Sequence, residues 1–173
     1  SSAQGATAES QCNLCGAGKY GDQVKQIAMG TGTADGCKTC GVGKYGAEAG
    51  QISNTVACKS CAAGRFQATV GQAACGACEA GTYNAEIGQS SISKCVKCGK
   101  GKYSSAQGAT AESQCNLCGA GKYNDQVAQT SMGTGTGNGC KTCGAGKYGA
   151  EAGQISSTVA CKSCAAGRFQ ATV

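Results

Sequence analysis

The sequence predicts a small disulfide-rich fold: an elongated, solenoid-like rod of tandem cysteine-rich modules with short β-hairpins and little or no helix. Three observations lead to this prediction. Only 17 of the 173 residues are Leu, Ile, Val or Phe, whereas a chain that builds a packed core has ~20% or more of these residues. The chain also contains 16 cysteines and 30 glycines. Finally, the cysteines recur in one motif throughout, so we expect cross-links to replace the missing core.

All 16 cysteines fall into eight Cys-x-x-Cys pairs. The pairs are Cys12/Cys15, Cys37/Cys40, Cys58/Cys61, Cys75/Cys78, Cys95/Cys98, Cys115/Cys118, Cys140/Cys143 and Cys161/Cys164. Each pair is followed by two small or polar residues, a glycine, a residue that is usually basic, and an aromatic residue. All of the chain's aromatic residues occupy this last position: Tyr20, Tyr45, Phe66, Tyr83, Tyr103, Tyr123, Tyr148 and Phe169. We predict that each ring packs on a disulfide as the miniature core of its module, and that the glycine before it has a positive φ.

A longer repeat is superimposed on the modules. Residues 1–70 recur as residues 104–173 with eight differences, so the higher repeat is 103 residues and five modules long. The predicted modules are residues 1–36 (a linker plus module 1), 37–57, 58–74, 75–94, 95–114, 115–139 (module 1 of the second copy), 140–160 and 161–173 (a partial module 3). Near-identical copies indicate a window on a longer array.

Secondary structure is expected to be sparse. Short stretches of alternating pattern predict β-ladders around residues 19–20 and 51–56. The Gly-, Ser- and Thr-rich segments between the cysteine pairs are typical of turns. No amphipathic helix is apparent.

Two kinds of cross-link fit the cysteine pairs. In a disulfide ladder, the second cysteine of each pair bonds the first cysteine of the next pair. The predicted bonds are Cys15–Cys37, Cys40–Cys58, Cys61–Cys75, Cys78–Cys95, Cys98–Cys115, Cys118–Cys140 and Cys143–Cys161. Alternatively, two successive pairs supply four thiolates to a tetrahedral zinc ion, and the spacing of the pairs is compatible with such a site.

The five-module period favours the ladder. Zinc takes pairs two at a time and five is odd, so Cys12/Cys15 and the identical Cys115/Cys118 would share metal with neighbours on opposite sides. The ladder gives every module the same role, and it predicts that Cys12 and Cys164 bond to neighbouring modules. Each closed loop stabilises the fold by ~3 kcal/mol. Zinc held by sets of four cysteine thiolates stays open as the alternative, whereas a thioredoxin-type redox centre lacks the helix N-terminus that lowers a thiol pKa.

Several functional classes are excluded by the composition. The chain has no histidine and no paired carboxylates at a fixed spacing, so we predict neither an enzyme nor a cofactor. Its 15 basic and 9 acidic residues give a net charge of +6, but they are scattered, and we expect no nucleic-acid partner. No apolar stretch approaches the ~18 residues of a membrane span.

The motif resembles a known family. Cys-x-x-Cys-x-x-Gly-x-Tyr, a Ser/Gly/Gln-rich loop and a further Cys-x-x-Cys pair are similar to the ephrin-receptor-like cysteine-rich repeat, and more loosely to tumour-necrosis-factor-receptor and EGF-like modules. The resemblance covers all eight modules, although the family usually has proline after the second cysteine and this chain has none. It implies an extracellular, disulfide-bonded rod of stacked modules without catalytic residues, and it supports the ladder.

These features lead to one functional hypothesis and one alternative. We expect a secreted, cell-surface structural subunit that self-assembles into an extracellular filament or fibre, such as a flagellar hair, because identical repeats present identical surfaces at regular intervals. The alternative is the ligand-binding or adhesive ectodomain stalk of a receptor. Glycans are a second predicted partner. The candidate O-glycosylation sites are Thr31, Thr33, Ser53, Thr55, Ser90, Ser91, Thr134 and Thr136.

Overall fold

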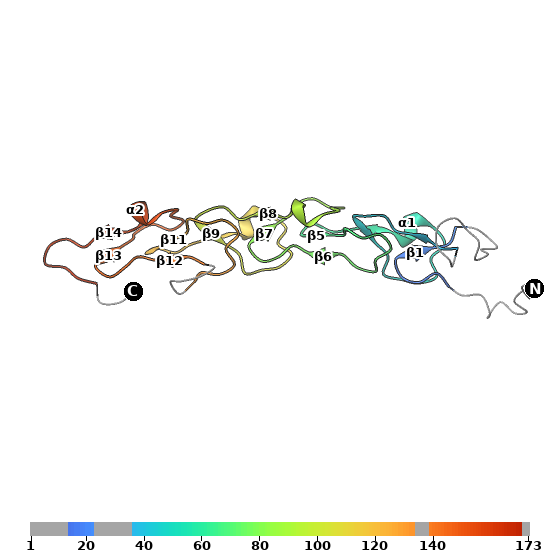
Figure 1. The fold of residues 1–173 in the computed structure, drawn as a ribbon, viewed down its shortest axis with the longest axis horizontal. Helices are drawn as coiled ribbons and strands as arrows, with labels where there is room; N and C mark the ends of the chain where they lie inside the picture. The colour runs from blue at the N-terminus through green and yellow to red at the C-terminus, as the bar shows by residue number, and fades with distance from the viewer. Residues whose placement is uncertain (1–13, 23–35, 134–138, 171–173) are drawn as a thin grey trace, which may run out of the picture. The chain divides into compact units, whose positions relative to one another are not determined.

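The computed structural model describes residues 14–22, 36–133 and 139–170 (Figure 1). The chain divides into two compact units. Unit 1 comprises Ser1–Cys61, Gln67–Cys75 and Gly88–Ser90, and unit 2 comprises Ala62–Phe66, Gly76–Ile87 and Ser91–Val173. Both units are built from two-stranded antiparallel hairpins whose strands are only two residues long.

Unit 1 contains two of these hairpins. They are β1 (Lys19–Tyr20) with β2 (Lys38–Thr39), and β3 (Lys44–Tyr45) with β4 (Lys59–Ser60). In each hairpin, the basic and aromatic residues of one motif pair with the two residues inside the next Cys-x-x-Cys pair. The motif therefore encodes both strands, and one short helix, α1 (Asn54–Ala57), precedes β4.

Unit 2 repeats the same hairpin five times. The pairs are β5 (Arg65–Phe66) with β6 (Gly76–Ala77), β7 (Thr82–Tyr83) with β8 (Val96–Lys97), β9 (Lys102–Tyr103) with β10 (Asn116–Leu117), β11 (Lys122–Tyr123) with β12 (Lys141–Thr142), and β13 (Lys147–Tyr148) with β14 (Lys162–Ser163). Its helical turns are η2 (Ile92–Lys94), η3 (Glu112–Gln114) and α2 (Ser157–Ala160). The predicted fold class, a small disulfide-rich chain of tandem short hairpins with little helix, is confirmed.

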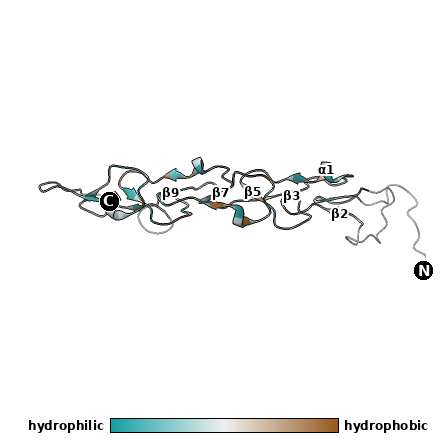
Figure 2. Cartoon of the chain, turned by 90° about the horizontal axis from the view of Figure 1, so that it is seen from above, coloured by the Kyte–Doolittle hydropathy of each residue, from teal (hydrophilic) through white to brown (hydrophobic). Residues whose placement is uncertain are grey.

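The buried interior of the described residues consists mainly of cysteine. The only other buried hydrophobic residues there are Ala57, Ala109 and Ala160. Figure 2 accordingly shows only short brown stretches of hydrophobic chain. Since an isolated two-stranded hairpin is marginally stable at best in water, the hairpins depend on cross-links and on the segments that pack against them.

The sequence prediction of a strand over residues 51–56 is only partly correct. Gln51 forms a parallel bridge with Tyr20, but Asn54–Ala57 is the helix α1. The Ala57 N–H donates to the Ser53 carbonyl at 2.9 Å, which closes the helical turn. This turn buries Ala57 in a cluster with Cys40 and Cys58, and that burial outweighs the local strand pattern.

No helix among the described ranges is both long enough and apolar enough to cross a membrane. The division into eight modules stays a prediction.

Candidate functional site: the disulfides and the loop cradles

Seven disulfides link successive cysteine pairs. Unit 1 contains Cys15–Cys37, Cys40–Cys58 and Cys61–Cys75, and unit 2 contains Cys78–Cys95, Cys98–Cys115, Cys118–Cys140 and Cys143–Cys161. Their Cα atoms lie 5.3–5.8 Å apart, in the usual range for disulfides. The bonds therefore run from the second cysteine of one pair to the first cysteine of the next, as in the ladder.

The two terminal cysteines of the ladder differ in what the structure shows. Cys12 lies outside the described residues. Cys164 is half-buried and is the free cysteine of the part of the chain that the structure describes. Their bonds to neighbouring modules stay predictions. Fourteen cysteines are paired in these disulfides, and zinc held by cysteine thiolates stays the alternative that the sequence left open.

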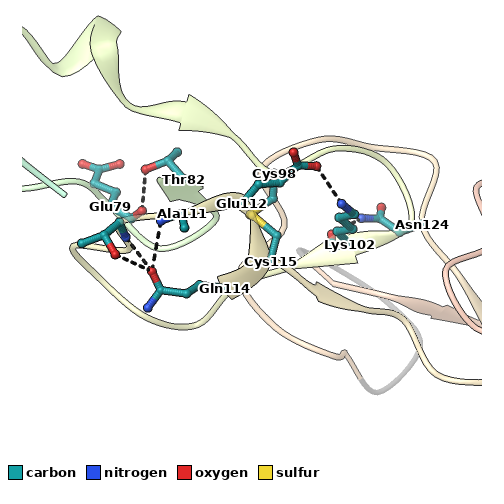
Figure 3. The surroundings of a disulfide bond; sticks show 10 residues. Glu79, Thr82, Cys98, Lys102, Ala111, Glu112, Gln114, Cys115 and Asn124 are labelled. Carbon is teal, nitrogen blue, oxygen red and sulfur yellow. Dashed lines mark hydrogen bonds and ion pairs between the residues drawn. A yellow bond between two sulfur atoms is a disulfide. The ribbon is translucent and has the colours of Figure 1, made fainter. Parts of the chain in front are cut away.

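Short helical turns position the first cysteine of several pairs. The turns α1, η2, η3 and α2 end directly before Cys58, Cys95, Cys115 and Cys161. Figure 3 shows the turn before Cys115, where the Gln114 side-chain oxygen accepts hydrogen bonds from the Thr110 and Ala111 N–H groups at 2.6 and 3.2 Å. At the other end of η3, Lys102 Nζ lies 2.7 Å from Glu112 Oε1. These contacts fix the turn that presents Cys115 to Cys98.

The aromatic residues follow the predicted packing in part. Tyr20 packs against Cys40, Cys58 and Ala57, and Tyr123 packs against Cys143, Cys161 and Ala160. Tyr45, Phe66, Tyr83 and Tyr103 are half-buried. Tyr148 and Phe169 are 47% and 85% exposed. For these two rings, the predicted packing on a disulfide stays a prediction.

The candidate glycosylation sites divide into three groups. Thr31, Thr33, Thr134 and Thr136 lie outside the described residues. Thr55 and Ser90 are exposed. Ser53 and Ser91 are half-buried and precede helical turns, where their hydroxyls lie 3.2 Å from Thr55 Oγ1 and 2.9 Å from Ser93 Oγ. O-glycosylation stays a prediction at all eight positions.

A recurring ion pair was not anticipated from the sequence. Lys38 Nζ lies 2.5 Å from Asp22 Oδ2, and Lys141 Nζ lies 2.8 Å from Asp125 Oδ1 in the second copy. In both copies the aspartate stands two residues after the aromatic and the lysine follows the next first cysteine. Each ion pair therefore links the two strand segments of a hairpin on its exposed side. Lys141 Nζ also lies 5.9 Å from the centre of the Tyr123 ring.

We expect the Lys141→Met substitution to raise the pKa of Asp125. The hydrogen bond from Lys141 lowers the pKa of this carboxyl, and the same contact raises the pKa of Lys141. The carboxylate's contribution to stability is therefore present above its unfolded-state pKa and is lost as pH falls through the lowered folded-state value. NMR titration of the Asp125 carboxyl carbon measures the change. The control Lys162→Met should leave the Asp125 pKa unchanged, and equal pKa values in all three proteins would contradict the assignment.

The feature with most bearing on function is a repeated docking of loops onto hairpins. Six of the eight aromatics lead into such a loop, and we call the residue five positions after each of these six the loop residue. The loop residues are Gly50, Gly71, Gly88, Gly108, Ala128 and Gly153. Each donates its N–H to the carbonyl of a second cysteine at 2.7–2.9 Å. A second hydrogen bond runs in the opposite direction. The residue that follows the aromatic of that cysteine's motif donates its N–H to the carbonyl of the residue after the loop residue, at 2.9–3.0 Å. We call the two groups that hold the loop, namely the cysteine carbonyl and the N–H of the residue after the aromatic, a cradle.

The cradles repeat without change of register within each unit. In unit 1 the loop residues Gly50, Gly71 and Gly88 bind the carbonyls of Cys15, Cys40 and Cys61. In unit 2 Gly108, Ala128 and Gly153 bind those of Cys78, Cys98 and Cys118. Each loop follows the aromatic of one module and forms its hydrogen bonds with the module before that one. This contact supplies packing that a single hairpin cannot provide.

The backbone conformation favours glycine on both sides of the contact. The glycine of each cysteine motif has φ between +71° and +79°, as predicted, and the glycine loop residues have φ between +70° and +74°. A Cβ on Gly18, Gly43, Gly64, Gly81 or Gly101 would lie within 3.0 Å of the carbonyl of the loop residue docked there. The motif glycine is therefore conformationally necessary, and it also leaves room for the loop backbone.

Ala128 is the exception among the loop residues, and we expect Ala128→Gly to stabilise unit 2 by about 1 kcal/mol. It has φ +58°, which costs an alanine ~1–2 kcal/mol and a glycine nothing, against ~0.5–1 kcal/mol of extra chain entropy for glycine. Hydrogen exchange of the residue 128 N–H, which donates to Cys98 at 2.9 Å, measures the gain. The reverse change Gly108→Ala (φ +70°) should lower protection at its own cradle. Faster exchange in Ala128→Gly would contradict this expectation.

Comparison with known proteins supports the repeat type. Residues 50–95 and 71–115 match the family described as tyrosine-protein kinase ephrin type A/B receptor-like. No curated protein matches the chain. The matched segments and the seven disulfides identify a cysteine-rich repeat and indicate an extracellular module, because such bonds persist in oxidising compartments.

Proposed function

We propose that this chain is a structural subunit of an extracellular filament or surface fibre, and that it self-assembles and performs no catalysis. The observation that carries the proposal is the repeated cradle: within each unit, successive loops dock onto successive hairpins in one register. Identical docking in identical repeats suits a quasi-one-dimensional array, whose stability is a sum over neighbouring modules. The 62 matching positions of 70 between the two copies support the same conclusion.

A receptor stalk is the second candidate, and the family match favours it. A receptor that binds a ligand needs a distinctive surface, and the two copies offer little difference from which to build one. Under either proposal the array is oxidised. Zinc held by cysteine thiolates is the alternative that the test below must also address.

Two measurements on the purified chain test the proposal. The first is alkylation without reductant followed by non-reducing peptide mapping. We expect the seven ladder bonds and bonds from Cys12 and Cys164 to further copies of the repeat, whereas bound zinc with alkylated thiols would overturn the oxidised array. The second is electron microscopy over a range of concentrations. Fibres of constant width are expected, and a species that stays monomeric at every concentration would overturn self-assembly and favour the stalk.

A further inference from the structure

We propose that unit 2 carries a binding surface for a linear anionic polysaccharide, formed by lysines that surround the docked loop of residues 124–128. The inference goes beyond the proposed function and applies equally to a filament and to a receptor stalk. It starts from one concentration of charge in a chain whose basic residues are otherwise scattered. Four lysines stand within nine positions, and residues 87–111 contain no acidic residue. The four are Lys94, Lys97, Lys100 and Lys102.

The fold places two of these lysines beside the two ends of the loop of residues 124–128. The carbonyl of the residue after Lys97 accepts a hydrogen bond from the Ala128 N–H at 2.9 Å. The N–H of the residue after Lys100 donates to the Asn124 carbonyl at 2.8 Å. Both lysines are exposed. The loop therefore lies between two solvent-exposed cations of one cysteine motif.

A third lysine reaches the same loop from a later module. Lys141 Nζ lies 2.8 Å from Asp125 Oδ1, and Asp125 is the second residue of the loop. The hydrogen bond from Lys141 lowers the pKa of Asp125, and the charge of Lys100 adds to this shift, so the Lys100 ammonium group also lies near that carboxylate. We call Lys97, Lys100 and Lys141 the lysine cluster. Its three positive charges against the single negative charge of Asp125 leave an excess of two.

The excess charge has no role in holding the loop. Within the part of the chain that the structure describes, neither Lys97 nor Lys100 forms an ion pair. The other five cradles form with uncharged residues at these two motif positions, namely Leu14 and Ala17, Thr39 and Val42, Ser60 and Ala63, Ala77 and Ala80, and Leu117 and Ala120. Loop docking therefore does not need the two lysines, and their charge is available to a partner.

The lysine cluster and its surroundings fit a polymer that carries both negative charges and hydroxyl groups. Lys97 and Lys100 are three positions apart, which a chain spans in at most about 11 Å, so both ammonium groups reach one polymer. An ammonium group is a point charge without the rigid fork of a guanidinium, and this suits sulfate or carboxylate groups along a flexible chain. The exposed Gln126 amide in the middle of the loop adds a donor and an acceptor for hydroxyl groups.

Two other anionic partners fit the lysine cluster less well. A second copy of the chain offers no two acidic residues closer than seven positions, so its charge density does not match that of the cluster. Proteins that bind single-stranded nucleic acid add exposed aromatic rings on which bases stack. Tyr103 and Tyr123, the aromatics of the motifs on either side of this loop, are half-buried.

Calorimetric titration of the full chain with dextran sulfate at low salt tests the inference. We expect binding that weakens as sodium chloride is added, because exposed charges are screened. The double variant Lys97→Gln/Lys100→Gln should bind about tenfold more weakly. The control Lys59→Gln/Lys162→Gln removes the same charge at two exposed lysines outside the cluster and should bind like the parent. Hydrogen exchange of the Ala128 N–H checks that the loop stays docked in both variants.

Further probes identify the anionic group and the class of partner. Tighter binding of dextran sulfate than of polygalacturonate would assign a sulfated polysaccharide, and the reverse a carboxylated one; either supports the inference. Equal binding of neutral dextran, equal weakening by both double variants, or tighter binding of single-stranded DNA of the same length would overturn it. So would loss of self-association in Lys97→Gln/Lys100→Gln with polysaccharide binding intact, which would assign the lysine cluster to a second copy.

NMR of the isotope-labelled parent decides the question even where the variant does not keep its loop docked. Addition of dextran sulfate should shift the amide signals of Lys97, Lys100 and Gln126. Shifts confined to residues outside the lysine cluster and its loop would overturn the inference.

Discussion

Replacing Gly101 with alanine is expected to weaken loop docking in unit 2 by about 3 kcal/mol. Two effects add. Gly101 has φ +75°, which costs alanine ~1–2 kcal/mol, and the new Cβ would lie within 3.0 Å of the Gly153 carbonyl, an overpacking that costs ~1–3 kcal/mol. Hydrogen exchange of the Gly153 N–H, which donates to Cys118 at 2.7 Å, reports the loss directly. Its protection should fall by about a hundredfold, since ~1.4 kcal/mol corresponds to a factor of ten.

Matched variants separate the two effects. Gly121 has nearly the same φ, +76°, but no atom within 4 Å of an ideal Cβ, so Gly121→Ala carries the backbone cost alone and should leave the Gly153 N–H protected. Gly99→Ala lies at a position with open space and no positive φ, and we expect a change within ~0.5 kcal/mol. Equal loss of protection in Gly101→Ala and Gly99→Ala would show that the loop carbonyl does not sit over the motif glycine.

Much of the framework could be predicted from the cysteines alone. Equivalence of the copies favours the bonding of Cys15 with Cys37 and its analogues, because a zinc register would shift by one module in each higher repeat. The hairpins follow from the motif, since the dipeptide Lys19–Tyr20 and the residues Lys38–Thr39 are held together by that first disulfide. The motif residues and the disulfide beside them therefore determine these hairpins, and both are visible in the sequence.

The loop docking could not be predicted in this way, although a signal for it exists. The steps between cysteine pairs vary from 17 to 25 residues, so the loops look irregular when they are measured from the cysteines. Measured from the aromatic, each of the six loop residues is five positions on; Tyr45, for example, precedes Gly50, and Phe66 precedes Gly71. The length variation falls between the loop residue and the next cysteine. Each loop also binds an earlier module, so its partner carbonyl is distant in sequence and no local pattern identifies it.

The strand predicted over residues 51–56 is wrong at its second half for a related reason. The alternating pattern of these residues is typical of a strand. The chain instead forms a helical turn, which buries Ala57 against the Cys40–Cys58 disulfide. The second copy supports this reading. Asn54 is replaced there by Ser157, and α2 forms with Ala160 at 5% exposure, so the turn depends on the buried alanine and tolerates the exchange at its exposed start.

Complete reduction of the disulfides is expected to unfold both units. Each bond contributes ~3 kcal/mol through the entropy of the unfolded chain, and the buried hydrophobic residues of the described chain are cysteines and three alanines. Reduction therefore disrupts the buried interior, because the cysteines that form it have few other large apolar side chains to pack against. Two-residue hairpins cannot persist without it. The dispersion of amide NMR signals, recorded before and after addition of a phosphine reductant, measures the transition.

Single bonds can be tested against a matched control. The double variant Cys98→Ser/Cys115→Ser removes a bond whose cysteines are 0% and 5% exposed, and we expect faster trypsin cleavage at Lys102 on β9. Cys164→Ser changes a cysteine that forms no bond within the described residues and should leave the cleavage rate at Lys102 as in the parent. Dispersion that survives full reduction would contradict the disulfide-dependent fold. If that dispersion were then lost on addition of a zinc chelator, thiolate-bound metal would be the cross-link, and the oxidised extracellular array would have to be abandoned.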